Sequence, residues 1–179
     1  MAEFQRVVVT PEVARAIRTH GEATYPHECC GALIGVGERI TAAVSLPNTT
    51  EEGPRRRFLV RPSDYRMAEA EASVRGADLL GFYHSHPDHP ARPSQFDLDH
   101  AWPNFAYIIV SVAGSGEIHG GGAATADPSR RSTEGAKAEG AKSGPMTVWF
   151  LTEDRSRFDE GELNGDQNPD SNPAQAVHG

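Results

Sequence analysis

Short apolar runs alternate along this 179-residue chain with polar segments rich in proline, glycine and charge. Runs of β-branched and small apolar residues are typical of buried strands, and the apolar run FAYIIVSV predicts a central strand. On this criterion we expect strands at residues 4–10, 29–36, 39–46, 77–86, 105–112 and 146–151, with a brief strand at 57–60 and a last strand or turn around Phe158 and Leu163.

Three segments between these strands carry the signals of helices. The pair Thr10-Pro11 is typical of a helix start and predicts a helix that Gly21 ends. A second helix is predicted at 62–75 and a short third helix at 94–101. This alternation of strands and helices predicts an α/β fold with a mixed central β-sheet flanked by helices.

The chain length fits one domain that can bury a real core. We assign residues 1–163 to that domain. Within it, residues 114–145 are rich in glycine, alanine, serine and charge, so they are expected to form a mobile insert. The tail at 164–179 is expected to be disordered because of its composition.

Composition narrows the partners and the compartment. The net charge of −8 argues against nucleic acid or an anionic membrane as the main partner, since both favour basic surfaces. No apolar run approaches the roughly 18 residues needed to span a bilayer, and the start of the chain lacks the layout of a secretory signal. Cys29 and Cys30 are the two cysteines, and neighbours in sequence are poorly placed to form a disulfide. We therefore expect a cytoplasmic protein.

The segment GFYHSHPDHPARPSQFDLDH, at 81–100, concentrates side chains that can bind a metal. His84 and His86 lie two residues apart at a strand end, so both imidazoles point to one face. Ser94 and Asp97 have the spacing of a helix capping box, and the prolines before them would turn that helix start back toward the histidines. Two nitrogens and one carboxylate suit zinc with water as a fourth ligand. On spacing alone, a solvated polar loop and an ordinary helix start remain the alternative.

A catalytic zinc site also needs a base that takes a proton from water. The candidate is Glu28, in the stretch YPHECCGALIG at the mouth of a buried strand. Glutamates are mostly surface residues, so the alternative is an exposed loop acid. Glu28 can reach His84 if the strands 29–36 and 77–86 are neighbours in the sheet.

Taken together, these residues resemble the JAMM (MPN-plus, Mov34/MPN/PAD-1) zinc metalloprotease family, in its short prokaryotic form. The family motif is a glutamate followed far downstream by His-x-His, seven residues, Ser, two residues and Asp. Its positions match Glu28, His84, His86, Ser94 and Asp97 with no departure in spacing. The flanking pattern Pro-x-Glu-x-Cys-Gly-x-Leu-x-Gly is also present, at 26–35.

This resemblance implies a cytidine-deaminase-like α/β sandwich and a zinc-dependent hydrolase. Family members cut the isopeptide or peptide bond after the C-terminal Gly-Gly of ubiquitin or ubiquitin-like proteins. In prokaryotes the corresponding tails belong to small sulfur-carrier proteins, so such a carrier and its conjugates are the expected partners. Whether the chain forms a homodimer is left open.

The roles that the resemblance implies follow the motif. One zinc ion would be held by His84, His86 and Asp97, with water as its fourth ligand. Glu28 would be the catalytic base, and Ser94 would donate a hydrogen bond to the oxyanion. We expect the substrate tail to add a strand to an exposed sheet edge.

Other functions share parts of this pattern. Release of cysteine from a sulfur-carrier adduct during cysteine biosynthesis would use the same residues. A non-catalytic MPN scaffold would have lost the ligands that are intact here. A nucleobase deaminase of the same fold would need cysteine zinc ligands in a Pro-Cys-x-x-Cys setting, which this chain lacks. His100, one turn after Asp97, is more simply read as an exposed histidine than as a residue that orients a ligand.

Overall fold

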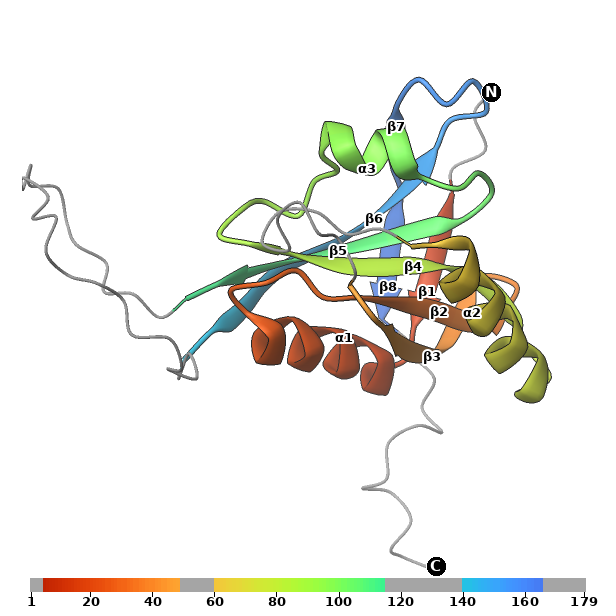
Figure 1. The fold of residues 1–179 in the computed structure, drawn as a ribbon, viewed down its shortest axis with the longest axis horizontal. Helices are drawn as coiled ribbons and strands as arrows, with labels where there is room; N and C mark the ends of the chain where they lie inside the picture. The colour runs from red at the N-terminus through yellow and green to blue at the C-terminus, as the bar shows by residue number, and fades with distance from the viewer. Residues whose placement is uncertain (1–4, 49–59, 115–139, 166–179) are drawn as a thin grey trace, which may run out of the picture.

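The computed structural model describes residues 5–48, 60–114 and 140–165, which form one mixed sheet of eight strands with three helices (Figure 1). The spatial order of the strands is β7-β6-β5-β4-β2-β3-β1-β8. The elements are β1 (Arg6–Val9), α1 (Pro11–Thr24), β2 (Cys30–Val36), β3 (Arg39–Leu46), α2 (Pro62–Val74), β4 (Asp78–Pro87), α3 (Gln95–His100), β5 (Ala106–Ala113), β6 (Lys142–Leu151), β7 (Phe158–Glu160) and β8 (Glu162–Gly165). The predicted α/β fold with a mixed sheet flanked by helices is confirmed.

The two faces of the sheet are covered by different helices, with α1 on one side and α3 on the other (Figure 1). Val13 and Ile17 of α1 pack with Leu33, Ile108 and Val110 in one apolar cluster. The opposite face holds a second cluster, whose buried members are Cys30, Ala32, Leu46, Val60, Ala68, Phe82, Ala101 and Tyr107. Within the described residues, no helix has the length and apolar character needed to cross a membrane.

Helix α1 begins as predicted but continues past Gly21. The Thr10 hydroxyl accepts a hydrogen bond from the Val13 N–H, and Pro11 takes the first helical position. The predicted end at Gly21 is wrong because this glycine is buried against the sheet. A Cβ at Gly21 would lie 2.9 Å from Cγ2 of Val112, so glycine lets the helix approach β5 closely. The helix therefore runs to Thr24.

Helix α2 covers the second face through small residues. Ala68 and Ala72 are buried one turn apart, whereas Met67 is 49% exposed. The helix ends at Val74, and Gly76 follows with φ of 63°, a conformation that glycine adopts without strain. The brief strand predicted at 57–60 lies almost wholly outside the described residues.

The predicted mobile insert ends earlier than expected, because β6 begins at Lys142. Residues 142–145 are polar or small and gave no strand signal, but Lys142 and Ser143 pair with Ala113 and Val112 of β5. Pro145 sits at the irregularity of this ladder, where a proline does not interrupt regular pairing. Residues 115–139 of the predicted insert lie outside the described residues.

The predicted tail also begins later than expected. Strand β8 extends to Gly165 because it pairs in parallel with β1 along Arg6 to Val9. The expected last strand or turn around Phe158 and Leu163 is two short strands, β7 and β8. The rest of the predicted tail, 166–179, lies outside the described residues.

Candidate metal centre

Strand β4 carries the two histidines on the face that α3 covers. His84 and His86 alternate with Tyr83 and Ser85, which point to the α1 face. The Nε2 atoms of the two imidazoles are 3.0 Å apart, and His84 has no exposed surface. Strand β2 pairs with β4 from Asp78 to His84, strand β5 pairs with it from Gly81 to Pro87, and together they hold this geometry.

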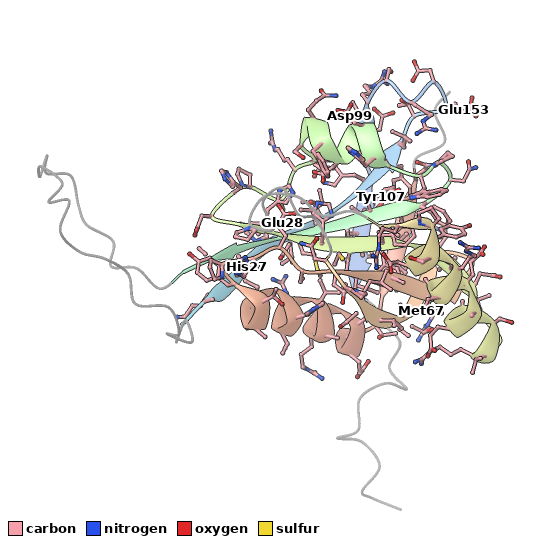
Figure 2. All side chains as sticks on the ribbon, viewed as in Figure 1. His27, Glu28, Met67, Asp99, Tyr107 and Glu153 are labelled. Atoms are coloured by element: carbon pink, nitrogen blue, oxygen red, sulfur yellow. The ribbon has the colours of Figure 1, made fainter. Side chains whose placement is uncertain are left out.

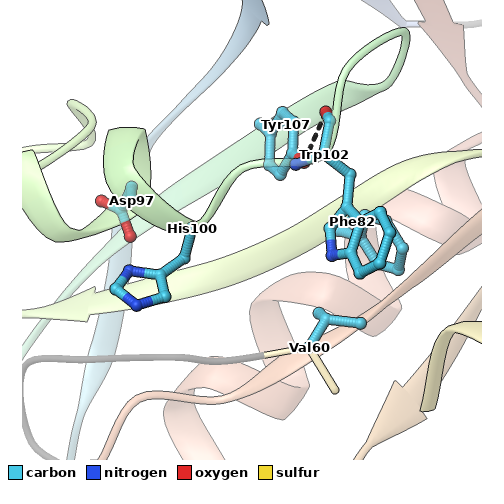
Figure 3. A pocket seen from close by; sticks show the side chains of 6 residues that line it. All are labelled: Val60, Phe82, Asp97, His100, Trp102 and Tyr107. Carbon is cyan, nitrogen blue, oxygen red and sulfur yellow. Dashed lines mark hydrogen bonds between the residues drawn. The ribbon is translucent and has the colours of Figure 1, made fainter. Parts of the chain in front are cut away.

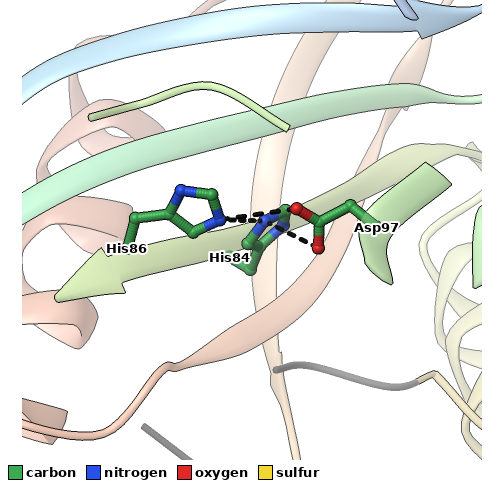
Figure 4. Close-up of side chains that lie close together, drawn as sticks. All are labelled: His84, His86 and Asp97. Atoms are coloured by element: carbon green, nitrogen blue, oxygen red, sulfur yellow. Dashed lines mark hydrogen bonds and ion pairs between the residues drawn. The ribbon is translucent and has the colours of Figure 1, made fainter. Parts of the chain in front are cut away.

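Helix α3 brings a carboxylate to the same place. Ser94 caps the helix, and its backbone N–H donates to Oδ2 of Asp97 at 2.6 Å, which completes the predicted capping box. The other carboxylate oxygen, Oδ1, lies 3.4 Å from Nε2 of His84. Asp97 is buried, so it leaves the helix surface and faces the sheet (Figure 4).

The three side chains fit a zinc ion. Ligand atoms about 2.0–2.1 Å from a tetrahedral zinc lie about 3.3 Å from one another. The separations here are 3.0 Å between the imidazoles, 3.4 Å from His84 to Asp97 and 3.5 Å from His86 to Asp97 (Figure 4). Two neutral nitrogens and one carboxylate are a zinc donor set that leaves a fourth position for water or substrate. Among the described residues, these three form the one group of histidine, cysteine or acidic side chains that could hold a metal ion.

The orientation of His86 is set by a backbone carbonyl. Its Nδ1 lies 2.9 Å from the carbonyl oxygen of Pro90, which can only accept a hydrogen bond. Nδ1 therefore carries the proton, and in the neutral ring Nε2 presents its lone pair toward Asp97 and His84. No sequence pattern predicts this contact, because the acceptor is a main-chain atom.

Glu28 lies beside the three ligands. Cys30 pairs with His84 in the antiparallel ladder of β2 and β4, and continuing that register by two residues brings Glu28 opposite His86. Glu28 is 3% exposed, and its Oε2 has no hydrogen-bond partner among the described residues. The Asn48 amide donates to the Glu28 carbonyl at 3.0 Å and fixes the backbone (Figure 2 shows Glu28 near the sheet).

Burial and mutual charge interactions shift the pKa values of all four side chains. Burial raises the pKa of Glu28 to about 8; His86 opposes this rise and Asp97 adds to it. Burial also acts against the charge of Asp97, but the two imidazoles outweigh it and hold the pKa of that carboxyl well below its usual range. Burial lowers the pKa of His84. For His86 burial acts in the same direction, yet the Asp97 carboxylate outweighs it and raises the pKa.

Ser94 stands at the edge of this group and is exposed. Its Oγ lies 2.7 Å from Oδ2 of Asp97, so the hydroxyl helps to orient that ligand. The hydroxyl proton can turn from Asp97 toward a substrate oxygen by rotation about one bond, while the Ser94 N–H keeps its hold on Oδ2.

Other polar residues of the segment 81–100 lie outside the group. His89 and Asp99 are exposed, and Asp99 lies on α3 (Figure 2). His100 stacks on Phe96 with ring centroids 4.0 Å apart, and its Nδ1 contacts the Phe96 carbonyl. His27, next to the base in sequence, is also exposed.

Two hollows lie near the C-terminal end of α3, and the smaller one adjoins Asp97. The smaller, about 10 Å³, has room for about one water molecule and is lined by Val60, Phe82, Asp97, His100, Trp102 and Tyr107 (Figure 3). The Tyr107 hydroxyl accepts from the Trp102 N–H at 2.6 Å and closes its back wall. The larger, an open groove of about 360 Å³, shares Val60, His100 and Trp102 with it and continues to Arg155.

The structure does not supply a free sheet edge at the metal site within the described residues. Strand β4 is paired on both sides, and the edge strands are β7 and β8. Two strands separate β4 from β7, and three separate it from β8. The expected binding of a substrate tail at a sheet edge therefore finds no support in this part of the chain.

The comparisons with known proteins agree with the site. The family model of prokaryotic homologs of the JAB domain matches residues 10–126, which contain all five motif positions. Over 98 residues the chain is 38% identical to "Desampylase" of Haloferax volcanii, covering 52% of this chain and 69% of that protein. Over 97 residues it is 32% identical to the "Probable TtuB-protein conjugate cleaving protease" of Thermus thermophilus, covering 54% of this chain and 64% of that protein.

A solved structure shares the fold over nearly the full chain. The solution structure of a protein from Salinibacter ruber has a TM-score of 0.59 and 33% sequence identity, covering 91% of this chain and 94% of that one. The family match, the relatives and the fold confirm the resemblance to JAB/MPN proteins. The chain belongs to the family of prokaryotic homologs of the JAB domain.

Proposed function

We propose that this protein is a zinc metalloprotease that cleaves conjugates of a ubiquitin-like protein. The observation that carries the proposal is the buried cluster of His84, His86 and Asp97 with Oε2 of Glu28 beside it, an atom that has no hydrogen-bond partner in the part of the chain that the structure describes. Leaving a buried carboxylate oxygen without a partner costs about 1–3 kcal/mol or more, which a purely structural site would avoid. The names of the Haloferax volcanii and Thermus thermophilus relatives support the same class of reaction.

Each residue has a role that its position supports. Zinc, when bound, supplies a Lewis acid and lowers the pKa of a coordinated water toward 7. His84, His86 and Asp97 hold the ion. Glu28 accepts a proton through Oε2 and later delivers it to the leaving amine, a contribution of about 10²- to 10⁴-fold.

Ser94 supplies a hydrogen bond to the scissile carbonyl oxygen. Its hydroxyl lies within 2.7 Å of a zinc ligand, so it stands at the edge where a substrate would approach. A donor aimed at the oxygen that gains charge is worth about 10²- to 10³-fold in kcat at other hydrolase sites.

The substrate proposed is a bond after a C-terminal Gly-Gly of a ubiquitin-like sulfur-carrier protein. The ligands are buried, and the open groove lies at Asp99 and His100, on the same helix as Asp97. A tail without side chains could bring its carbonyl to such a recessed centre, whereas larger residues would meet the walls at Val60 and Trp102.

The test offers two substrates to the zinc-loaded protein. One is the carrier joined to a lysine side chain, and the other is the carrier with a C-terminal cysteine. We expect the isopeptide conjugate to be cleaved, and mass spectrometry measures its disappearance. Loss of the cysteine adduct alone would favour the cysteine-releasing alternative, and loss of neither, with zinc bound, would contradict the proposal.

A further inference from the structure

The loop between β4 and α3, residues 88–93, is tied to three strands through three consecutive carbonyls. The His89 carbonyl accepts from the Ser111 hydroxyl of β5 at 2.8 Å. The Pro90 carbonyl accepts from Nδ1 of His86 in β4 at 2.9 Å. The Ala91 carbonyl accepts from the Thr147 hydroxyl of β6 at 2.6 Å. The loop thus crosses the sheet face from β4 over β5 to β6.

The sheet register explains why β6 can reach this loop. His84 pairs with Ile109 of β5, and Ile109 pairs with Thr147 of β6. The side chain of Thr147 therefore lies on the same row as His84, with one strand between them, at about 10 Å. From there its hydroxyl meets the loop that carries the acceptor of His86.

The hydrogen bonds at Thr147 run in one direction. The indole N–H of Trp149 can only donate, and it lies 2.8 Å from the Thr147 oxygen. The Ala91 carbonyl can only accept, so the single hydroxyl proton of Thr147 is committed to it. Such a chain strengthens each of its bonds. The same indole N–H is also 3.3 Å from the Ala91 carbonyl.

Within the loop, the Arg92 N–H also donates to the Pro90 carbonyl, at 2.8 Å, so this carbonyl has one local partner besides His86, whereas the Ala91 carbonyl is held from β6. Pro90 and Pro93 have no N–H to donate, and Asp88 leaves the strand with φ of 56°. Ala91 is buried, whereas residues 88–90 are exposed. One peptide unit separates the carbonyl held by Thr147 from the carbonyl that orients His86. Three residues further on, Ser94 starts α3 and thereby places Asp97.

We propose that Thr147, supported by Trp149, is a positioning residue for the metal centre: it holds the 88–93 loop so that the Pro90 carbonyl orients His86 for zinc. This inference rests on the proposed zinc function. Thr147 touches neither the ion nor the substrate in this account, and it acts through two consecutive carbonyls of the loop.

The test measures zinc affinity of the folded, metal-free protein by competition with a chelator. Thr147→Val keeps the shape and removes the hydroxyl, and we expect about 10- to 100-fold weaker zinc binding. Thr147→Ser restores the hydroxyl and should bind zinc nearly as well as the wild type. Trp149→Phe removes the indole N–H and should weaken zinc by about tenfold, the lower end of that range.

The matched control is Thr152→Val, just beyond the other end of β6. The Thr152 hydroxyl lies 2.7 Å from Oδ1 of Asp154 and 3.0 Å from the Arg157 carbonyl, and it has no hydrogen bond to the 88–93 loop among the described residues. The zinc affinity of this variant should equal that of the wild type. At saturating zinc, kcat of Thr147→Val should recover while KM for the conjugate stays unchanged. Denaturant unfolding of the metal-free variant should show that it is fully folded under the assay conditions, which excludes a general loss of stability as the cause.

Three outcomes would overturn the inference. Thr147→Val could bind zinc as tightly as the wild type, or Thr152→Val could weaken zinc equally. If Thr147→Val does not fold, Trp149→Phe decides, and unchanged affinity there would count against the inference. A wild-type protein that binds no zinc would overturn the proposed function too. If the wild type binds zinc and is active, and Thr147→Val binds zinc equally tightly, only the inference about Thr147 fails.

Discussion

The polar side chains on the two faces of strand β4 differ in their hydrogen bonding. On the α1 face, Tyr83 and Ser85 are buried and paired with protein atoms: Nδ1 of His20 lies 2.8 Å from the Tyr83 hydroxyl, and the Ser85 hydroxyl accepts from the Cys29 N–H at 2.9 Å. On the α3 face, His84 and His86 meet Asp97, and the neighbouring Glu28 keeps an oxygen without a partner among the described residues.

The two faces of β4 therefore have different roles: one stabilises the fold and the other provides groups that can bind a ligand. Satisfied polar groups hold β2, β4 and α1 together and stabilise the fold. The α3 face gathers donor atoms and charge that are better explained by a ligand than by packing. Substitutions on the α3 face should therefore alter metal binding and activity, and substitutions on the α1 face should alter the stability of the fold.

Removing a ligand should have the largest effect. His84→Ala and Asp97→Ala should each lose bound zinc and reduce cleavage to background, because two remaining ligands cannot hold the ion. Metal analysis and the conjugate assay check this. Asp78→Ala, exposed at the start of β4, is the control and should keep both; zinc retained by His84→Ala would refute the ligand assignment.

Removing the base should separate metal binding from turnover. Glu28→Gln keeps the size of the side chain but not its proton-accepting oxygen, so zinc content should stay at one ion per chain. The rate should fall by about 10²- to 10⁴-fold. Single-turnover cleavage beside metal analysis measures both, and full activity in this variant would remove Glu28 from the mechanism.

A change on the α1 face should cost stability alone. A Cβ at Gly31 would collide with the Tyr83 ring, so Gly31→Ala should lower the free energy of unfolding by about 1–3 kcal/mol. Denaturant unfolding of the metal-free protein checks this. Gly165→Ala, at the end of β8 with nothing within 4 Å of the added Cβ, controls for the loss of glycine itself. If Gly31→Ala instead abolished zinc binding in a stable protein, the two faces would not be separable.

The smallest effect concerns His20 of α1. Burial lowers the pKa of His20 below its ordinary 6.5. The unfolded chain therefore binds a proton first as the pH falls, and stability should decrease below about pH 6.5 until the folded-state pKa is passed. His20→Gln should flatten this part of the stability curve, measured by unfolding at pH 7.5 and 5.5. An unchanged slope would show that His20 does not contribute.

The sequence predicted the elements with strong local patterns. The runs at 29–36, 39–46 and 105–112 are nearly the strands observed, and the capping box at Ser94 and Asp97 formed as its spacing indicated. Local sequence patterns failed where contact with a distant strand determines the structure. Gly21 reads as a helix end but is a contact with β5, and the strand at 142–145 depends on pairing with β5.

The candidate site was predictable for a related reason. Its donors are side chains at fixed spacings, and the two-residue period of a strand placed His84 and His86 together. Two features could not be read from spacing. The Pro90 carbonyl that orients His86 is a backbone atom common to every residue, and Thr147 meets the loop only because β6 lies beside β5.

The central claim is that zinc lies between His84, His86 and Asp97, with Glu28 within reach of the ligand in its fourth position. A crystal structure of the wild-type protein grown with zinc, with anomalous data at the zinc absorption edge, tests this most directly. We predict one peak bonded to Nε2 of both histidines and to Asp97, with a Glu28 carboxylate oxygen in hydrogen-bond range of the fourth ligand. A peak elsewhere, or a Glu28 carboxylate turned away from the ion, would contradict the account.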